Sequence, residues 1–388
     1  YIDQQYDTFD GIGCLFSFTR TIKSFCKTEL LKTMEKLRVM LHYTEAGTQR
    51  SPNDQADLIR SCNYLKERCE FITLNQAELP SEIGHIESIR RLYHDIKTCR
   101  PDIVHIIGVK EGFHCAVAAK MAGIKKRILI TRGFAGYTSV ISKLRRLIFR
   151  WFIEPLTIVL CSDVHCNSRF SASLPMIQQY ARHKNQVIYN FLNITPTNPN
   201  RPWRKEHNLT DNDFVVVTVG NMHRGKGYDI LQKAIDHFKH RKDVKFVIIG
   251  DGPLKENFDN VNAPNLVSGR VMSLGALPHT QAMQIVSEAD IFFLPSRYES
   301  LGMVFAEAAA YGVPCIGTAV GGIPEIIENG RTGFINPIED VNSAITQIQQ
   351  LSQDNILKKK MGNYAHDRIK SLFDSDKIGR QIFELYMK

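Results

Sequence analysis

Residues 296–312 read Ser-Arg-Tyr-Glu-Ser-Leu-Gly-Met-Val-Phe-Ala-Glu-Ala-Ala-Ala-Tyr-Gly, and this stretch says most about the fold. The apolar run that precedes it, Ile291 to Leu294, is typical of a buried strand. The alanine-rich run that follows favours a helix, because alanine has the highest helix propensity. The order strand, loop, helix predicts an α/β sheet with Glu299 at the carboxyl end of a strand and Glu307 inside the next helix.

The position of these two glutamates indicates a binding site. Open α/β sheets bind ligands outside the carboxyl ends of their strands. The helix that begins near Gly302 offers free N–H groups and the positive end of a helix dipole, which suits a phosphate. Glu299 and Glu307 could accept hydrogen bonds from sugar hydroxyls. The alternative is that both are solvated surface glutamates.

Apolar segments alternate with amphipathic segments along the rest of the chain from Lys36 onward. Such alternation predicts parallel sheets with helices on both faces. A linker rich in Asn, Pro and Thr, residues 193–204, divides the pattern in two. The expected strands are 37–43, 70–74, 102–107, 127–131, 157–161, 186–189, 214–219, 244–249, 290–294 and 314–318, and the helices expected after the linker are 226–239, 279–288 and 302–311.

The bulk composition is that of an ordinary globular protein. The 388 residues are enough for two domains, and 43% of them are hydrophobic and 23% charged, which excludes disorder. No stretch approaches the roughly 18 apolar residues of a membrane span. The nine cysteines contain no Cys-x-x-Cys pair, so we expect free thiols in a reducing compartment, the cytoplasm.

Positive charge is concentrated in the first half of the chain. Residues 1–200 hold 27 Lys/Arg and 18 Asp/Glu, whereas residues 201–388 hold 22 of each. This imbalance indicates an anionic partner for the first half. Nucleic acid is not expected, because neither an aromatic-basic RNA motif nor a zinc spacing occurs. Basic and large apolar residues interleave in 142–152, which suits a helix lying on anionic lipid; the alternative is an ordinary helix packed on the sheet.

Four segments of the chain, in this order, resemble the motifs of the retaining glycosyltransferases of family 4, which have the GT-B fold. They lie at 217–227, 246–253, 289–302 and 314–327. The resemblance covers about residues 36–380 and is stronger in the second half. It implies two Rossmann-like, doubly wound parallel-sheet domains that face each other across a cleft. The expected divisions are an extension at 1–33, an acceptor-binding domain at 34–195, a donor-binding domain at 205–370, and a helix at 371–388 that crosses back to the first domain.

The resemblance assigns most of the donor site to the second domain. Lys226 would neutralise the diphosphate of a nucleotide-sugar; the alternative is a solvated lysine. Glu299 would contact the donor sugar near its reacting carbon. Glu307 would hold the ribose hydroxyls, and the alternative is a buried helix glutamate paired with a lysine. The remaining expected donor contacts are the turn residues Asn221 and Arg224, the N–H groups of Gly302 and Met303, and Met272 in the segment 271–274 for the base.

The first domain carries weaker matches to the family. Gly47, in the loop after the first expected strand, would approach the diphosphate from the other side of the cleft. Arg132 stands where many family members have a histidine; it would contact the sugar or an acceptor phosphate, or form a structural salt bridge. His105 is expected at the edge of the core. No metal or other cofactor is expected, because Lys226 and helix dipoles would supply the positive charge.

The resemblance implies a retaining, metal-independent hexosyltransferase. The donor would be a UDP-sugar, with a GDP-sugar second, and the acceptor a glycan or a lipid-phosphate-linked glycan in surface polysaccharide biosynthesis. The enzyme would lie in the cytoplasm and contact the inner membrane face through residues 142–152. Two other functions stay open: a sugar-nucleotide epimerase of the same fold, and a non-catalytic sugar-nucleotide-binding or scaffold subunit.

Overall fold

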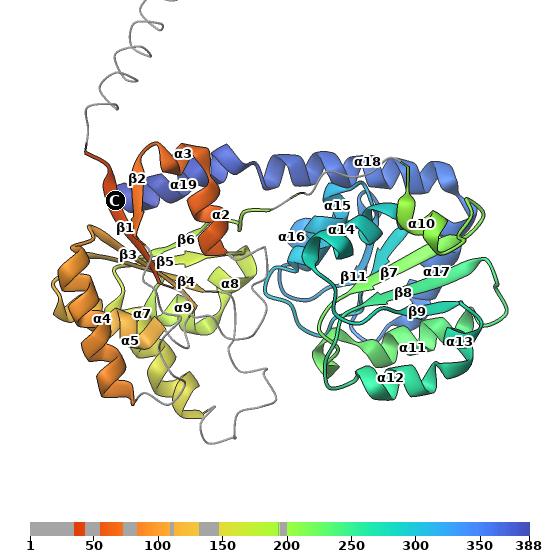
Figure 1. Cartoon of the computed structure of the whole chain (residues 1–388), viewed down its shortest axis with the longest axis horizontal. Coiled ribbons are helices and arrows are strands. Elements are labelled where there is room, and N and C mark those ends of the chain that lie inside the picture. The colour runs from red at the N-terminus through yellow and green to blue at the C-terminus, as the bar shows by residue number, and fades with distance from the viewer. Residues whose placement is uncertain are drawn as a thin grey trace, which may run out of the picture.

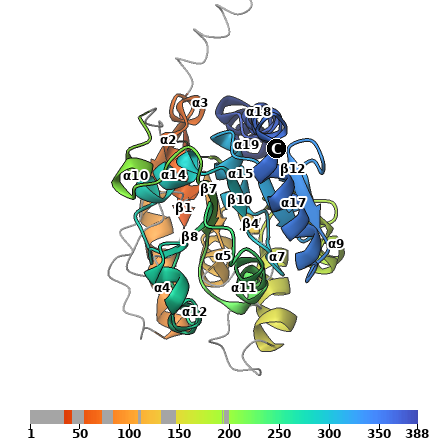
Figure 2. The same ribbon diagram turned by 90° about the vertical axis from the view of Figure 1, so that its right-hand side faces the viewer.

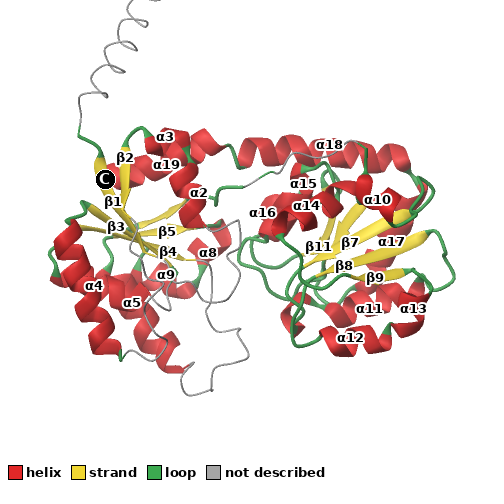
Figure 3. Ribbon diagram, viewed as in Figure 1, coloured by secondary structure: helices red, strands yellow, loops and turns green. Residues whose placement is uncertain are grey.

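The computed structural model consists of two α/β domains, each built on a parallel six-stranded sheet (Figure 1). It describes residues 35–42, 55–72, 84–108, 112–131, 147–192, 194 and 200–388. Helices pack around both sheets (Figure 3). The predicted fold class, two doubly wound parallel-sheet domains, is confirmed. The residue boundaries expected for the domains stay a prediction, and the 1–33 extension lies outside the described residues.

The first sheet has the strand order β2-β1-β3-β4-β5-β6, and all its neighbouring strands are parallel. Its central strands are fully buried because helices cover both faces of the sheet. The strands are β1 (Leu37–His42), β2 (Cys69–Ile72), β3 (Ile103–Ile107), β4 (Lys126–Thr131), β5 (Asp163–Cys166) and β6 (Asn185–Val187).

One of the helices around this sheet lies where a strand was predicted. Of residues 157–161, predicted as a strand, all but Cys161 belong to helix α7, and the strand follows at β5. A short apolar run has no period that distinguishes a strand from a buried helix, and Pro155 suits the first turn of a helix. The helices are α2 (Gln55–Ser61), α3 (Asn63–Lys66), α4 (His85–Cys99), α5 (Gly112–Met121), the π-helical turn η3 (Phe149–Ile153), α7 (Glu154–Leu160), α8 (Arg169–Ser173) and α9 (Pro175–Tyr180).

The second sheet has the order β12-β11-β10-β7-β8-β9 and is also parallel throughout. Two short strands at its edges, β9 and β12, were not predicted. Runs of three or four residues are too short to show a period. The strands are β7 (Phe214–Val219), β8 (Val244–Ile249), β9 (Val271–Ser273), β10 (Ile291–Phe293), β11 (Cys315–Thr318) and β12 (Gly333–Asn336).

Helices cover both faces of the second sheet, and the long helix α18 runs along one side of it (Figure 1). Helix α14 has the same bounds as the segment predicted for it, 279–288. The helices are α10 (Pro202–Glu206), the 3-10 turn η4 (Arg224–Lys226), α11 (Tyr228–His237), α12 (Lys255–Val261), α13 (Ala263–Val267), α14 (His279–Glu288), α15 (Met303–Ala310), α16 (Ile323–Ile326), α17 (Val341–Gln353) and α18 (Asn355–Leu372).

The last helix, α19 (Ser375–Met387), leaves the second domain and packs on the first. Figure 2 shows α18 and α19 together along one edge of the molecule. The Tyr386 hydroxyl lies 2.8 Å from Nδ1 of His105 in β3. Burial lowers the pKa of His105 well below its usual value, so this histidine is a neutral core residue that anchors α19.

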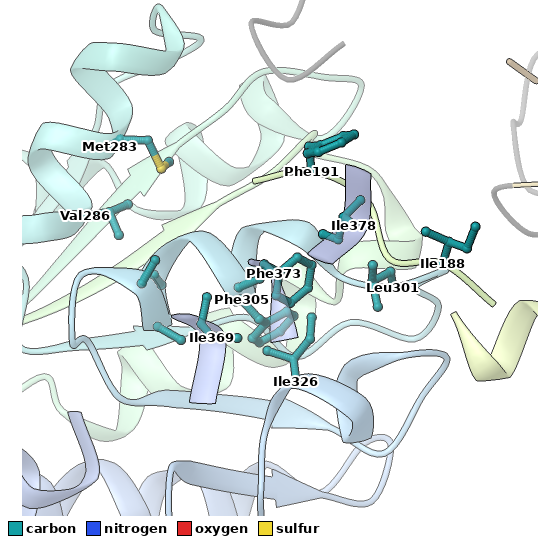
Figure 4. Packing of buried hydrophobic residues seen from close by; sticks show 14 of the residues in the cluster. Ile188, Phe191, Met283, Val286, Leu301, Phe305, Ile326, Ile369, Phe373 and Ile378 are labelled. Carbon is teal, nitrogen blue, oxygen red and sulfur yellow. The ribbon is translucent and has the colours of Figure 1, made fainter. Parts of the chain in front are cut away.

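One hydrophobic cluster is continuous between the two domains (Figure 4). Ile188 and Phe191, which follow β6, belong to the same cluster as Leu301 and Phe305 of the second domain. Phe305 is fully buried. The loop that carries Glu299 therefore lies on a core that both domains share.

Candidate active site

A cavity of about 1140 Å³ lies between the carboxyl ends of the two sheets. The first domain lines it with residues that come after β1, β5 and β6, and the second domain with the loops after β7, β8, β9 and β10 and with α14 and α15. The lining residues are Gln55, Asn167, Asn190, Val219, Gly220, Asn221, Lys226, Ile249, Gly250, Asp251, Ala276, Leu277, Pro278, His279, Thr280, Ala282, Met283, Glu299, Ser300, Leu301, Gly302, Met303, Val304 and Glu307.

The floor of the cavity is formed by the glycine turns after β7 and β8, which touch each other. The hydroxyl of Tyr228 donates a hydrogen bond of 2.7 Å to the carbonyl of Gly220. A Cβ at Gly250 would lie 1.9 Å from that same carbonyl oxygen, and its φ of 150° also disfavours a side chain. Only glycine fits at this position, and its small size lets a ligand approach the backbone closely.

Lys226 and Glu299 form an ion pair in this cavity. Lys226 Nζ lies 2.5 Å from Glu299 Oε1, and the Ser296 hydroxyl donates to the same oxygen at 3.1 Å. Both side chains are largely buried, with 18% and 11% exposed. Burial, and then the positive charge of Lys226, lower the pKa of neighbouring His223. The ammonium group of Lys226 therefore lies in the cavity wall, where the carboxylate of Glu299 holds it in place.

Helix α15 begins at the cavity edge. Gly302 precedes it with φ of 85°, a left-handed conformation that favours glycine. The first N–H groups of a helix have no intrahelical partner, and those at Gly302 and Met303 line the cavity here. Phe305, two residues further on, fixes the helix by packing on Phe292 of β10 at 5.1 Å between ring centroids. The positive end of α15 thus lies in the wall of the same cavity as Lys226.

Glu307 lies one turn into α15, where its side chain is only 7% exposed. His279, the first residue of α14, contacts it, with 3.2 Å between Nε2 and Oε1. The sequence did not predict a role for His279. Its one signal was its place at a helix start after a strand of the sheet, which alone is too common to single out a residue.

The other predicted site residues fall into two groups. Asn221 lines the cavity, but Arg224 is exposed in η4 and Met272 packs on the core, and neither lines it. Gly47 and Arg132 lie outside the described residues. The structure thus brings together Lys226, Glu299, Glu307, Gly302, Met303 and Asn221, and their roles stay predictions.

Metal-ligating residues do not cluster in this cavity. Within the described segments, no group of three or more His, Cys, Asp or Glu side chains is arranged to hold a metal ion. Among the described residues that line the cavity, the positive charge comes from Lys226 and the N-terminus of α15. A polyanion such as a diphosphate is the ligand chemistry that such a wall attracts.

Comparison with known proteins shows which family this chain resembles. The family model described as glycosyl transferases group 1 matches residues 199–368. A galactosyltransferase of Escherichia coli, UDP-Gal:alpha-D-GlcNAc-diphosphoundecaprenol alpha-1,3-galactosyltransferase, is 26% identical over 353 residues, which are 87% of this chain and 90% of that protein. Residues 199–368 of this chain form a glycosyl transferases group 1 domain, and the chain as a whole is similar to family 4-like glycosyltransferases of the GT-B fold. The family resemblance predicted from the sequence is confirmed.

A second relative matches this chain over a shorter length. N-acetyl-alpha-D-glucosaminyl L-malate synthase of Bacillus anthracis is 30% identical over 207 residues, which are 52% of this chain. The match spans 53% of that relative's length.

Solved structures share the fold of this chain. Anabaena HepE, crystallised with UDP and glucose, superposes with a TM-score of 0.71 at 18% identity, over 90% of this chain and 99% of that one. Sucrose-phosphate synthase of Thermosynechococcus elongatus has a TM-score of 0.71 at 17% identity, over 91% and 98% of the two chains. At these identities the likeness establishes the two-domain fold alone.

Proposed function

We propose that this glycosyltransferase moves a hexose from a UDP-sugar to a glycan or lipid-phosphate-linked acceptor, with retention of configuration and without a metal ion. The observation that carries the proposal is the second-domain wall of the cavity. There Lys226, Glu299 and Glu307 surround the N-terminus of α15, a set that matches a diphosphate, a sugar and a ribose in turn. A GDP-sugar is the second candidate donor.

In the proposed reaction, the bond between the anomeric carbon and the leaving phosphate oxygen breaks, and the acceptor oxygen bonds to that carbon on the same face. The acceptor proton passes to the departing diphosphate. Lys226 and the N–H groups of α15 stabilise the charge that develops on this diphosphate, so catalysis is positioning plus electrostatic stabilisation. Lys226 must turn from Glu299 towards the phosphate, which frees Glu299 to accept from sugar hydroxyls.

The choice of UDP rests on the similar proteins. HepE has been crystallised with UDP, and the name of the E. coli relative specifies UDP-Gal as donor. Glu307, whose buried side chain lines the cavity, would accept from both hydroxyls of a ribose, a group that every nucleotide donor carries. The names of the similar proteins favour uracil as the base of this donor.

The acceptor proposal rests on the first domain and on one relative. The name of the E. coli relative gives a diphosphoundecaprenol-linked acceptor, which is a lipid-linked phosphate. Residues 1–200 of this chain carry a net positive charge, which suits such an anionic acceptor. We propose a role in surface polysaccharide biosynthesis.

Contact with the cytoplasmic face of a membrane is part of this proposal. Large apolar side chains are exposed along η3 and α7, among them Trp151 at 67% and Phe152 at 68%. Basic residues precede them in 142–150, which favours anionic lipid. No helix in the described part of the chain combines the length and the apolar composition that a membrane span requires.

A thermal-shift screen with UDP, GDP, ADP, CMP and their sugar conjugates tests the proposed donor. A ligand at about 100 times its Kd stabilises by roughly 2.7 kcal/mol, which raises Tm by several degrees. We expect a shift with UDP and UDP-sugars alone. A shift with GDP alone would replace the donor, and no shift would favour the non-catalytic scaffold subunit. Conversion of one UDP-sugar into its epimer would identify the epimerase instead.

A further inference from the structure

The first domain is hydrogen-bonded to the loop that carries Glu299. The turn after β5 holds Asn167 and Ser168, and both contact Ser300, the residue next to Glu299. Ser168 Oγ donates to the Ser300 carbonyl at 3.1 Å, and Ser300 Oγ donates to Asn167 Oδ1 at 3.2 Å. These bonds join the turn after β5 in the first domain to the loop after β10 in the second domain, residues 296–302, which we call the donor-side loop.

A carboxylate from the second domain joins the same turn. Glu325 of α16 accepts the backbone N–H of Arg169 at Oε2 and that of Phe170 at Oε1, each at 2.9 Å. Oε2 also accepts the hydroxyl of Tyr189 at 2.9 Å. Hydrogen bonds to a charged acceptor are roughly twice as strong as neutral ones. Glu325 therefore binds the N-terminus of α8 and the segment after β6 at once.

The segment that carries Glu325 is held firmly on its own side. Arg368 of α18 donates to the carbonyls of Glu325 and Ile326, both at 2.9 Å. Gly321, at the turn just before α16, presses on the donor-side loop: its φ is 56°, and a Cβ there would lie 1.6 Å from the carbonyl oxygen of Glu299. The loop from Glu299 to Ser300 is therefore held between the turn before α16 and the turn after β5.

We propose that Glu325 is a positioning residue for sugar transfer: by bonding the first domain to the second, it fixes the loop that aims Glu299 into the cavity. The inference rests on the proposed function, since it names how that reaction is positioned. The Glu325 carboxylate touches neither Lys226 nor Glu307 by any bond described above, so the nucleotide wall does not depend on it. Its loss should impair transfer while nucleotide binding stays.

Tyr189 is a stable donor in this contact. Burial, followed by the negative charge of Glu325 and its hydrogen bond, raises the pKa of Tyr189 to about 12. The hydroxyl therefore keeps its proton across the neutral range. Tyr189→Phe removes this one donor and leaves the two backbone N–H bonds in place.

The test compares Glu325→Ala, Glu325→Gln and Tyr189→Phe with the wild type, using UDP titration and UDP release from UDP-glucose, UDP-galactose and UDP-GlcNAc. For Glu325→Ala we expect kcat to fall by about 10- to 100-fold, because small misplacements of reacting groups have effects of that size. The Kd for UDP should stay within about twofold, since distant sites act independently. Glutamine keeps one acceptor oxygen, so the kcat of Glu325→Gln should lie between those of the wild type and Glu325→Ala. Such a graded loss would exclude simple misfolding as the cause.

Hydrogen exchange of the whole protein supplies a readout that does not need turnover. The amides of Arg169 and Phe170 should lose protection in Glu325→Ala, and so should the peptide 296–302. Glu256→Ala, an exposed glutamate on α12 of the same domain, is the matched control and should match the wild type in all readouts.

The outcomes separate the two proposals. If the wild type releases UDP and Glu325→Ala does so at the same kcat, the positioning role of Glu325 is wrong and the proposed function stands. A parallel loss of UDP affinity and rate would also contradict positioning, because it would indicate general damage. If the wild type neither binds UDP nor releases it, the proposed function fails and the positioning role fails with it.

Discussion

The two sides of the cleft differ in how they present polar groups. The second-domain side carries charged groups. Lys226, Glu299 and Glu307 line the cavity together with the N-terminus of α15, and the side chains of the two glutamates are buried. On the first-domain side, the described lining residues are three neutral amides, Gln55, Asn167 and Asn190. Fixed charges bind a charged nucleotide tightly, whereas amides adapt to varied hydroxyl groups. We infer that the second domain determines donor affinity and the first determines where the acceptor lies.

The largest expected effect tests the chemical part of the second-domain side. Glu299→Ala should lower transfer by about 100- to 1000-fold, the range seen when a transition-state contact is removed. UDP affinity should be kept or improved, since Lys226 then loses its carboxylate partner and can bind the diphosphate. Steady-state UDP release and calorimetric titration with UDP measure the two quantities. Unchanged turnover in this variant would show that Glu299 lies outside the reaction centre.

Glu307 tests the binding part of the same side. Glu307→Ala should raise the Kd for UDP by about 10- to 100-fold, because hydrogen bonds to a charged group contribute about 1.5 to 3 kcal/mol. Glu307→Gln retains one acceptor and should give a smaller increase. Calorimetry with UDP and with uracil provides the comparison, since uracil has no ribose. Equal loss of both ligands would argue against the ribose contact.

The next effect concerns the first domain alone. Trp151→Ser combined with Phe152→Ser should weaken binding to vesicles containing anionic lipid by at least about tenfold, since each aromatic side chain contributes more than 1 kcal/mol when it leaves water. Binding of UDP should not change. Val267→Ser, at a more exposed apolar position of the second domain (91% exposed), is the control. Equal sedimentation of all these proteins with the vesicles would exclude the proposed membrane contact.

The smallest effect is on stability and its dependence on pH. Burial raises the pKa of Glu154 in α7 to about 7, with Arg150 opposing. A raised acid pKa means that the folded state binds the proton of Glu154 more tightly than the unfolded state does. The contribution of Glu154 to the free energy of unfolding is therefore greatest below about pH 4.5, and it is lost as the pH rises to about 7. The side chain of Glu154→Gln stays neutral at every pH. The free energy of unfolding of this variant, relative to that of the wild type, should therefore be about 1 to 3 kcal/mol higher at pH 8 than at pH 5.

Urea unfolding at the two pH values measures this difference. Glu384→Gln on α19, where the glutamate is exposed, should follow the wild type at both. If Glu154→Gln follows the wild type as well, Glu154 is ionised in the folded protein at neutral pH.

How far the sequence predicted the molecule depends on the range of the interactions. The strand 244–249 and the helix 279–288 were predicted because each has a local pattern that the tertiary structure keeps. Residues 157–161 were assigned wrongly because an apolar run of that length suits a helix as well as a strand.

The site shows the same limit. Lys226, Glu299 and Glu307 were found because they lie within motifs of continuous sequence. His279 contacts Glu307 only because α14 packs on α15, and Glu325 reaches the N-terminus of α8 from 155 or 156 positions along the chain. No local pattern encodes such contacts, since they depend on how the elements and the two domains pack.

A crystal structure of the protein with UDP tests the central claim most directly. The account predicts the ribose hydroxyls within hydrogen-bond distance of Glu307, and the diphosphate at Lys226 and at the first N–H groups of α15. It also predicts that Lys226 has left Glu299. UDP bound away from this wall, or in it with the ribose remote from Glu307, would contradict the account.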